Sequence, residues 1–157
     1  SAGGNLAAAA CLMAKDRRGP QIASQVLAYP ITNCDFNTPS YEQFAKGYFL
    51  TRDEMRWYWD QYVPSPDARL DPYASPCLRR DLAGLPPALV ITAECDVLRD
   101  EGEAYAKQLE SADNEVRLSR YPGMIHGFIR RYPFFDQGQA AIREISKWLQ
   151  NHPKSTL

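Results

Sequence analysis

The sequence predicts an α/β fold in which a mainly parallel sheet is flanked by helices. Two apolar runs of strand length, residues 26–29 and 88–93, alternate along the chain with segments of helical pattern. A third run, residues 116–121, alternates apolar and polar side chains and precedes a last helical segment. This order is typical of a parallel sheet joined by crossover helices, and 157 residues fit one domain.

The chain opens with a predicted helix. Leu6, Ala10 and Met13 recur at helical spacing in an alanine-rich stretch that closes with basic residues and the Gly19-Pro20 pair. The short run 26–29 follows and is closed by a proline, which favours a strand buried on both faces of the sheet.

A long connection, residues 33–72, is rich in aromatic side chains. Gly47, Pro64 and Pro66 interrupt it, so we expect two short helices in an insertion. Met55 and Trp59 would share one helix face, and such a pair belongs to a core more often than to the wall of a substrate pocket.

The second half of the chain predicts the remaining elements. The run 88–93 reads as a strand and residues 101–111 as a helix on which Tyr105 and Leu109 pair. The alternating run 116–121 fits a strand with one wet face near the sheet edge. Ile142, Ile145 and Leu149 mark one face of a last helix, and residues 153–157 are expected to form a frayed tail.

Composition excludes several classes of function. The 18 basic and 19 acidic residues leave a formal charge of −1, which offers no footprint for a nucleic acid. No apolar run approaches the ~18 residues of a membrane span, and the first residues lack the features of a signal peptide. The four cysteines show no CxxC spacing, so we expect buried or half-buried thiols, no metal, and a cytoplasmic location.

Reactive groups of parallel sheets gather in loops beyond the carboxyl ends of strands. The loop after residue 93 holds Glu94, Cys95 and Asp96, and the loop after residue 121 holds His126. The second histidine, His152, falls at the end of the last helix, where a cation interacts favourably with the helix dipole. These positions favour His126 over His152 as a site residue.

A histidine base requires a carboxylate and a nucleophile, and Ser1 is a candidate for the latter. The small residues that follow Ser1 suit a strained elbow between a strand and a helix. The alternative is a plain helix N-cap, in which the Ser1 hydroxyl accepts a hydrogen bond from an amide of the first turn. Considered alone, Ser1 fits the N-cap interpretation better.

Five segments, taken together, carry a resemblance to a known family. The chain resembles the hormone-sensitive-lipase-like (bacterial family IV) carboxylesterases of the α/β-hydrolase fold in residues 1–9 (SAGGNLAAA), 71–76 (DPYASP), 85–88 (LPPA), 96–102 (DVLRDEG) and 123–128 (GMIHGF). The order of serine, aspartate and histidine along the chain is also that of α/β-hydrolases. The resemblance covers nearly the whole sequence.

The resemblance implies a serine carboxylesterase that hydrolyses short to medium acyl esters without a cofactor. It makes Ser1 the nucleophile, Asp96 the orienting acid and His126 the base, and it makes the backbone N–H of Ala2 one donor of the oxyanion hole. Family members carry Gly-Asp before the serine and an upstream His-Gly-Gly-Gly segment, and neither occurs here.

Residues 1–157 are therefore expected to be the C-terminal portion of a single catalytic domain, inactive without the N-terminal portion. Residues 36–66 would contribute to the cap over the acyl pocket. The family has an aromatic residue and a proline around the acid, whereas this chain has Cys95 and Val97. Asp100 is the rival acid, although its place near a helix start favours capping of exposed amides.

Two other functions stay open at this point. The first is a non-catalytic receptor for a small ligand, because the plant gibberellin receptors resemble this family without a complete triad. The second is an N-terminal-nucleophile hydrolase, in which Ser1 would use its own α-amino group as the base. We also expect a possible homodimer through residues 116–121 and the last helix.

Overall fold

The computed structural model describes residues 1–153 and contains a three-stranded parallel sheet in the order β1-β2-β3. The strands are β1 (Gln25–Ala28), β2 (Ala88–Cys95) and β3 (Val116–Ile125). The predicted α/β class and all three strands are confirmed. Of the predicted tail, residues 154–157 lie outside the described residues.

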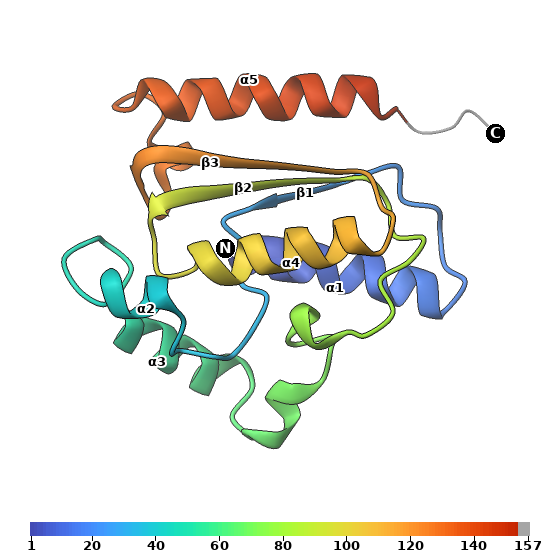
Figure 1. The fold of residues 1–157 in the computed structure, drawn as a ribbon, viewed down its shortest axis with the longest axis horizontal. Coiled ribbons are helices and arrows are strands. Elements are labelled where there is room, and N and C mark those ends of the chain that lie inside the picture. The colour runs from blue at the N-terminus through green and yellow to red at the C-terminus, as the bar shows by residue number, and fades with distance from the viewer. Residues whose placement is uncertain (154–157) are drawn as a thin grey trace.

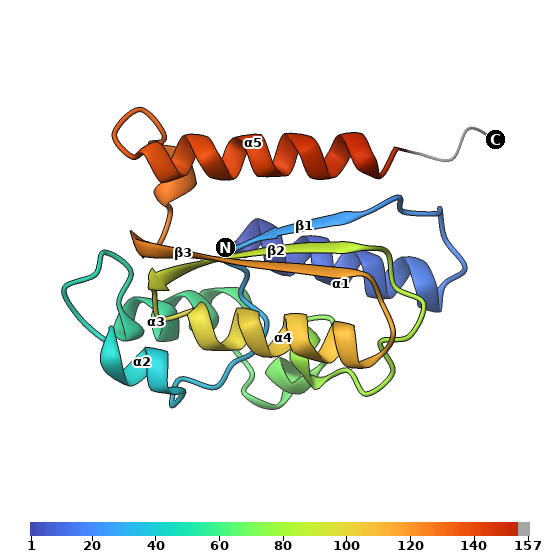
Figure 2. The ribbon, with the colours of Figure 1, turned by 45° about the horizontal axis from the view of Figure 1, so that its top comes forward.

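Helices cover both faces of the sheet. Helix α5 (Asp136–Asn151) lies over one face, and α1 (Ala2–Asp16) and α4 (Arg99–Ser111) lie over the other (Figures 1 and 2). Helices α2 (Pro39–Gln43) and α3 (Arg52–Tyr62) lie near the carboxyl ends of the strands. Residues 1–153 also contain three short 3₁₀ helices, η1 (Asp67–Leu70), η2 (Pro76–Leu78) and η3 (Phe128–Arg131).

Helix α1 is confirmed, but the residues that it buries differ from Leu6, Ala10 and Met13, whose spacing predicted the helix. Leu6 is 57% exposed, whereas Ala8, Cys11 and Leu12 pack against the sheet and α4. The reason is that alanine is small and only weakly apolar, so an alanine-rich helix carries little directional signal in its sequence. The basic end and Gly19 close the helix as predicted.

The face of α5 shows a similar difference. Ile145 packs against the core, but Ile142 and Leu149 are exposed, and the buried side chains are those of Ala141 and Trp148. Gly138 lets the first turn of the helix approach the preceding chain closely, because a Cβ there would lie 2.8 Å from the Tyr132 Cα. On α4, by contrast, the predicted pair Tyr105 and Leu109 is fully buried.

Two strands also differ in detail from the prediction. Strand β1 begins at Gln25, and Val26 and Ala28 are only half-buried, so it is not buried on both faces within the described chain. Strand β3 continues past the predicted end at Tyr121 to Ile125, with a register shift opposite β2. Proline and glycine at positions 122 and 123 thus lie within the strand rather than in a loop.

The insertion forms the two predicted short helices and its own small core. A capping box of Thr51 and Glu54 starts α3. Met55 and Trp59 are buried from one face of α3 and pack in a cluster that also includes Val97, beyond the carboxyl end of β2. The insertion therefore packs against the edge of the sheet at which the strands end and the following loops begin.

A proline lies between the two helices beneath the sheet. Pro30 follows β1, and a Cβ placed on Gly4 of α1 would lie 2.8 Å from the Pro30 Cβ. A Cβ on Gly102 of α4 would lie 3.3 Å from the Pro30 Cδ. Each helix approaches Pro30 this closely because it carries a glycine there.

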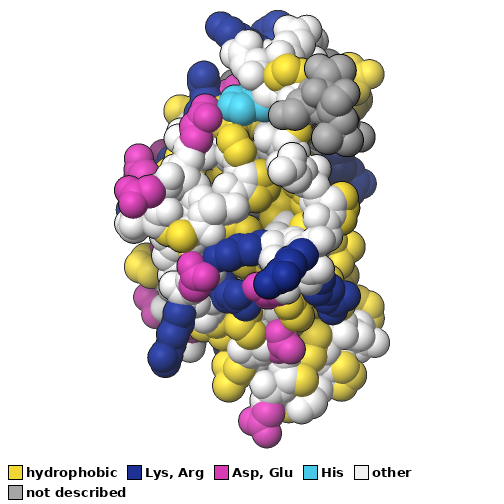
Figure 3. All heavy atoms as spheres, turned by 90° about the vertical axis from the view of Figure 1, so that its right-hand side faces the viewer, with side chains coloured by type: hydrophobic (Ala, Val, Ile, Leu, Met, Phe, Trp, Pro, Cys, Tyr) yellow, Lys and Arg dark blue, Asp and Glu magenta, His cyan; other side chains and the backbone are white. Residues whose placement is uncertain are grey.

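The face at the amino ends of the strands carries Lys, Arg, Asp and Glu side by side, with hydrophobic atoms between them (Figure 3). No helix of residues 1–153 is long and apolar enough to cross a membrane.

Candidate active site

Asp96 and His126 meet at the carboxyl edge of the sheet. Asp96 directly follows β2 and His126 directly follows β3, so the parallel pairing of these strands brings the two residues to the same edge. His126 Nδ1 lies 2.7 Å from Asp96 Oδ2, and both side chains are nearly inaccessible. The other oxygen of Asp96 accepts a hydrogen bond from the Leu98 amide, which fixes the carboxylate.

Ser1 joins this pair from the opposite side of the imidazole. Ser1 Oγ lies 3.1 Å from His126 Nε2. Ser1 occupies the N-cap position of α1, but its hydroxyl makes no capping hydrogen bond. The place of Ser1 before the first turn of α1 therefore matches the N-cap interpretation, whereas the contact of its hydroxyl with His126 does not. When Nδ1 donates to Asp96, Nε2 is free to accept the Ser1 proton.

Ala2 and the backbone of Ser1 complete the start of α1. The Ala2 amide belongs to the first turn, where N–H groups have no partner within the helix. The Ser1 nitrogen donates to the Ala28 carbonyl at the end of β1, while Ser1 Oγ faces His126. This geometry links the hydroxyl to the imidazole as its proton acceptor.

Tyr29 packs against the imidazole, a contact that the sequence did not predict. The ring centroids of Tyr29 and His126 are 4.7 Å apart. Tyr29 has a φ of +36°, a conformation that side-chain-bearing residues seldom adopt, and its amide donates to Ile91. A residue with such a φ at a site is held there by its surroundings. Nothing in the sequence hints at this conformation, because a residue that precedes a proline such as Pro30 is ordinarily extended.

The other two candidates lie in different networks. Asp100 accepts hydrogen bonds from the Ser40 amide, at 2.7 Å, and from Arg99, at 2.8 Å. It therefore supports the first turn of α2, rather than capping its own helix α4. His152 ends α5, with Nδ1 2.8 Å from the Trp148 carbonyl and its ring stacked on Trp148, and it lies away from Ser1.

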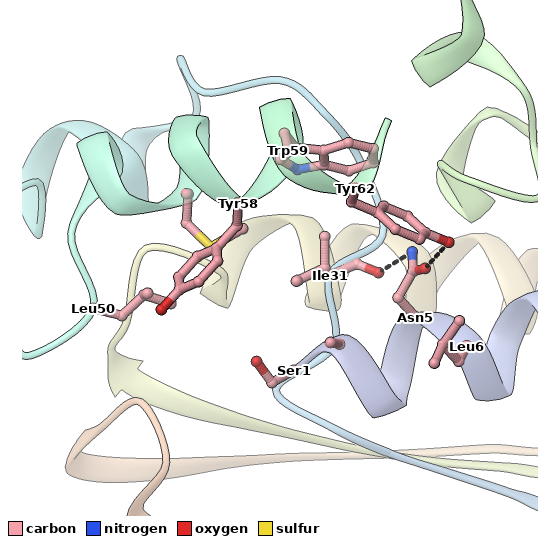
Figure 4. Close-up of a pocket in the computed structure, with 10 residues that line it drawn as sticks. Ser1, Asn5, Leu6, Ile31, Leu50, Tyr58, Trp59 and Tyr62 are labelled. Carbon is pink, nitrogen blue, oxygen red and sulfur yellow. Dashed lines mark hydrogen bonds between the residues drawn. The ribbon is translucent and has the colours of Figure 1, made fainter. Parts of the chain in front are cut away.

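An apolar pocket of about 290 Å³ opens beside Ser1 (Figure 4). Ser1 points toward it from the start of α1, and the side chains of α3 lie across from it. Its lining is Ser1, Ala2, Asn5, Leu6, Ile31, Leu50, Met55, Tyr58, Trp59 and Tyr62. Met55 and Trp59 thus serve both the core of the insertion and the wall of the pocket.

A loop of the insertion also contacts the segment that carries His126. The Arg131 guanidinium of η3 lies 4.0 Å from the centroid of the Phe49 ring. Phe49 has a φ of +75° and precedes Leu50, which lines the pocket. This cation–π contact connects the pocket wall to the chain just beyond the imidazole.

Asn5 ties α1 to its surroundings one turn after Ser1. Its buried amide group donates to the Ile31 carbonyl, at 2.9 Å, and to the Ala74 carbonyl, at 2.8 Å, and its oxygen lies 3.4 Å from the Tyr62 hydroxyl (Figure 4). The sequence did not single out Asn5, and a polar residue inside an alanine-rich helix was the available signal.

Glu101 is a second polar residue that the sequence did not single out. It lies in the first turn of α4, is 2% exposed, and accepts hydrogen bonds from the amides of Thr32 and Asn33. Burial raises the pKa of Glu101 to about 8, against the lowering effect of these two amides. Asp96 is close enough to raise the pKa of Glu101 further.

Within residues 1–153, no group of three or more His, Cys, Asp or Glu side chains is arranged to hold a metal ion. The four cysteines are free, one buried and three half-buried, as the sequence predicted. Burial raises the pKa of Cys11 to about 11 and that of Cys77 to about 12, so both are weakly reactive thiols.

Comparison with known proteins gives a consistent set of relatives. An ethyl acetate hydrolase of Pseudomonas putida is 36% identical over 97% of this chain and 48% of its own length. A carboxylic ester hydrolase of Mycobacterium tuberculosis is 38% identical over 97% of this chain and 42% of its own length. The chain thus spans about half the length of the curated relatives it matches.

Solved structures agree with these relatives. A fungal esterase from Rhizomucor miehei matches 96% of this chain and 47% of its own, with 46% identity and a TM-score of 0.92. A hyperthermophilic esterase from Pyrobaculum calidifontis matches 94% of this chain and 49% of its own, with 45% identity and a TM-score of 0.89.

The family model described as the alpha/beta hydrolase fold matches residues 1–130. This match includes Ser1, Asp96 and His126, and the relatives are named as esterases and ester hydrolases. The resemblance seen in the sequence is confirmed: the chain belongs to the α/β-hydrolase fold family, and the relatives it matches are named as esterases and ester hydrolases.

Proposed function

We propose that the protein containing this chain is a serine carboxylesterase that acts on short to medium acyl esters. The observation that carries the proposal is the continuous hydrogen-bonded line from Ser1 Oγ through His126 to Asp96. Ser1 is the nucleophile, His126 the general base and Asp96 the orienting carboxylate. The names of the relatives support the same reaction class.

The reaction runs through an acyl-enzyme. Ser1 Oγ bonds to the ester carbonyl carbon as its proton passes to His126 Nε2, and Asp96 stabilises the resulting imidazolium. The Ala2 amide donates to the oxyanion. The C–O bond to the alcohol then breaks, and the alcohol leaves with the proton from His126. Water then bonds to the acyl carbon as its proton passes to His126. The bond between that carbon and Ser1 Oγ breaks, the acid leaves, and His126 returns the proton to Ser1 Oγ.

The pocket beside Ser1 supports an uncharged apolar substrate. Its walls are aliphatic and aromatic, with Ile31, Met55 and Trp59 among them. Its volume of about 290 Å³ lies just below the range of small-molecule sites, roughly 300–1,000 Å³. An apolar acyl or alkoxyl group of modest length fits such a space better than a charged one, because burying an unpaired charge is costly.

The same proposal includes an N-terminal portion of the protein. Residues 1–157 would be the C-terminal portion of one catalytic domain, and residues 36–66 would form part of its cap. Two observations support this. The chain spans under half of its curated relatives' length, and within the described chain β1 pairs only with β2. The N-terminal portion would add donors to the oxyanion hole beside Ala2.

A cytoplasmic location is also part of the proposal. It is supported by the four free cysteines, since cytoplasmic thiols are kept reduced.

The test is hydrolysis of chromogenic short-chain esters by the full-length protein. We expect Ser1→Ala and His126→Ala to lower kcat by several orders of magnitude. His152→Ala is the matched control and should keep wild-type turnover, because His152 lies away from Ser1. We expect the isolated 157-residue chain to be inactive and to unfold without a cooperative transition. Ligand binding without turnover in the wild-type protein would contradict the proposal and favour a receptor.

A further inference from the structure

Glu101 occupies an unusual position for an acidic residue. It is almost completely buried, and one of its oxygens, Oε2, has no hydrogen-bond partner among the described residues. The Tyr41 hydroxyl, which lies near enough to influence the pKa of Glu101, is also buried without a partner there. A buried carboxyl is costly to fold around, so its presence calls for a specific role.

The contacts of Glu101 join α4 to the segment after β1. Glu101 Oε1 accepts hydrogen bonds from the Thr32 amide, at 2.7 Å, and from the Asn33 amide, at 3.2 Å. In return, the Thr32 hydroxyl donates to the Glu101 carbonyl at 2.8 Å. Three hydrogen bonds in a small buried volume fix these two stretches of chain relative to one another.

On one side, this connection reaches the orienting carboxylate. Glu101 lies in the first turn of α4, which begins a few residues after Asp96. The Arg99 amide donates to the Asp96 carbonyl, and the Leu98 amide donates to the Asp96 carboxylate. The Gly102 amide donates to the Leu98 carbonyl, so the turn that holds Glu101 and the turn that holds Asp96 are continuous.

On the other side, the connection reaches the nucleophile. Ile31, which precedes Thr32, lines the pocket, and its carbonyl accepts a hydrogen bond from the Asn5 side chain at 2.9 Å. The backbone N–H of Asn5 donates to the Ser1 carbonyl at 3.1 Å. The path from Asp96 to Ser1 therefore passes through Glu101, the segment after β1, and Asn5.

We propose that Glu101 is a positioning residue, which holds the segment at residues 31–33, and through Asn5 the start of α1, at the correct distance from the Asp96–His126 pair. The inference rests on the proposed function. Because Glu101 does not touch the reacting atoms, its loss shifts the nucleophile without removing any group of the triad. A displacement of ~1 Å at a reacting group costs up to ~100-fold in rate.

The test compares Glu101→Ala, Glu101→Gln and Glu103→Ala in the full-length protein. Glu103 is the matched control because it is a buried glutamate of the same helix, but it pairs with Arg120 and Thr92 rather than with residues 31–33. The measurements are kcat and KM separately, the pH profile of kcat/KM, and the unfolding temperature.

We expect Glu101→Ala to lower kcat by roughly 10- to 100-fold at temperatures where it stays folded. The acid limb of the pH profile should stay in place, since His126 and Asp96 keep their contact. Glu101→Gln should recover most of kcat, because the amide oxygen still accepts both backbone amides and a buried Glu101 with a raised pKa is itself largely uncharged near neutral pH. Glu103→Ala should lower the unfolding temperature and leave kcat unchanged.

If Glu101→Ala does not fold, Asn5→Ala breaks the next link of the same path and should give the same loss of kcat. Wild-type kcat in a folded Glu101→Ala or Asn5→Ala variant would overturn the inference, and so would an equal loss of kcat in Glu103→Ala. These outcomes differ from failure of the proposed function, because in that case Ser1→Ala itself would retain turnover.

Discussion

Replacing Gly4 by alanine tests how closely the position of Ser1 depends on the packing of α1. An added Cβ would lie 2.8 Å from the Cβ and 3.0 Å from the Cα of Pro30, whereas ordinary contacts begin at 3.4 Å. The first turn of α1 must therefore move by roughly 0.6 Å or more, since the rigid Pro30 backbone cannot yield easily. Ser1 occupies the N-cap position of this turn and moves with it.

The expected cost has two parts. Overpacking of this kind destabilises a fold by ~1–3 kcal/mol, offset in part by the ~1 kcal/mol that alanine gains over glycine in a helix. The Ser1–His126 contact of 3.1 Å would lengthen beyond hydrogen-bonding distance. We therefore expect kcat to fall by about tenfold or more, while KM for a short ester changes less.

The assay is ester hydrolysis by the full-length protein, together with denaturant unfolding. Gly3→Ala is the matched control, because its added methyl meets no described atom within 4 Å. The double variant Gly4→Ala with Pro30→Gly removes the Pro30 Cβ and should recover part of the lost kcat. The reasoning is refuted if Gly4→Ala hydrolyses the ester at the wild-type rate, or if the double variant is no more active than Gly4→Ala alone.

Further predictions follow from the same geometry. Asp96→Asn should lower kcat by ~10⁴-fold and Asp100→Asn only slightly, and the reverse order on one ester would move the acid's role to Asp100. The pKa of Glu101 is raised to about 8 from an ordinary 4.5, so between pH 4.5 and 8 the folded state keeps a proton that the unfolded state has lost. The free energy of unfolding therefore falls as the pH rises through this window, by ~1.4 kcal/mol per pH unit. Glu101→Gln should lack this loss in unfolding titrations at pH 5 and 9, and an identical loss in both proteins would contradict the assignment. Light scattering at tens of micromolar tests the predicted homodimer through β3 and α5, which a monomer would exclude.

Features with a local signal were predictable from the sequence. Asp96 follows an apolar strand and His126 follows a strand that alternates apolar and polar residues, and parallel strands end at one edge, so the meeting of these two side chains could be expected. The helix face that α1 buries could not, because small side chains such as Ala8 pack wherever backbones approach closely. Glu101 could not be singled out either, because a glutamate in a helix is ordinarily exposed. Its burial depends on backbone amides of a segment some 70 positions away, at Thr32.

The contact between Asp100 and Ser40 has a consequence for chimeric proteins. The first turn of α2 rests on the Asp100 carboxylate, and the Ser40 hydroxyl donates to the Val97 carbonyl at 2.7 Å. If residues 36–66 alone were transplanted from a relative, the new segment would lack the matching Asp100 carboxylate and Val97 carbonyl that accept its hydrogen bonds. The natural unit of exchange is therefore discontinuous: it pairs the insertion with residues 96–101, so a recombined protein would inherit its pocket wall and Asp96 together.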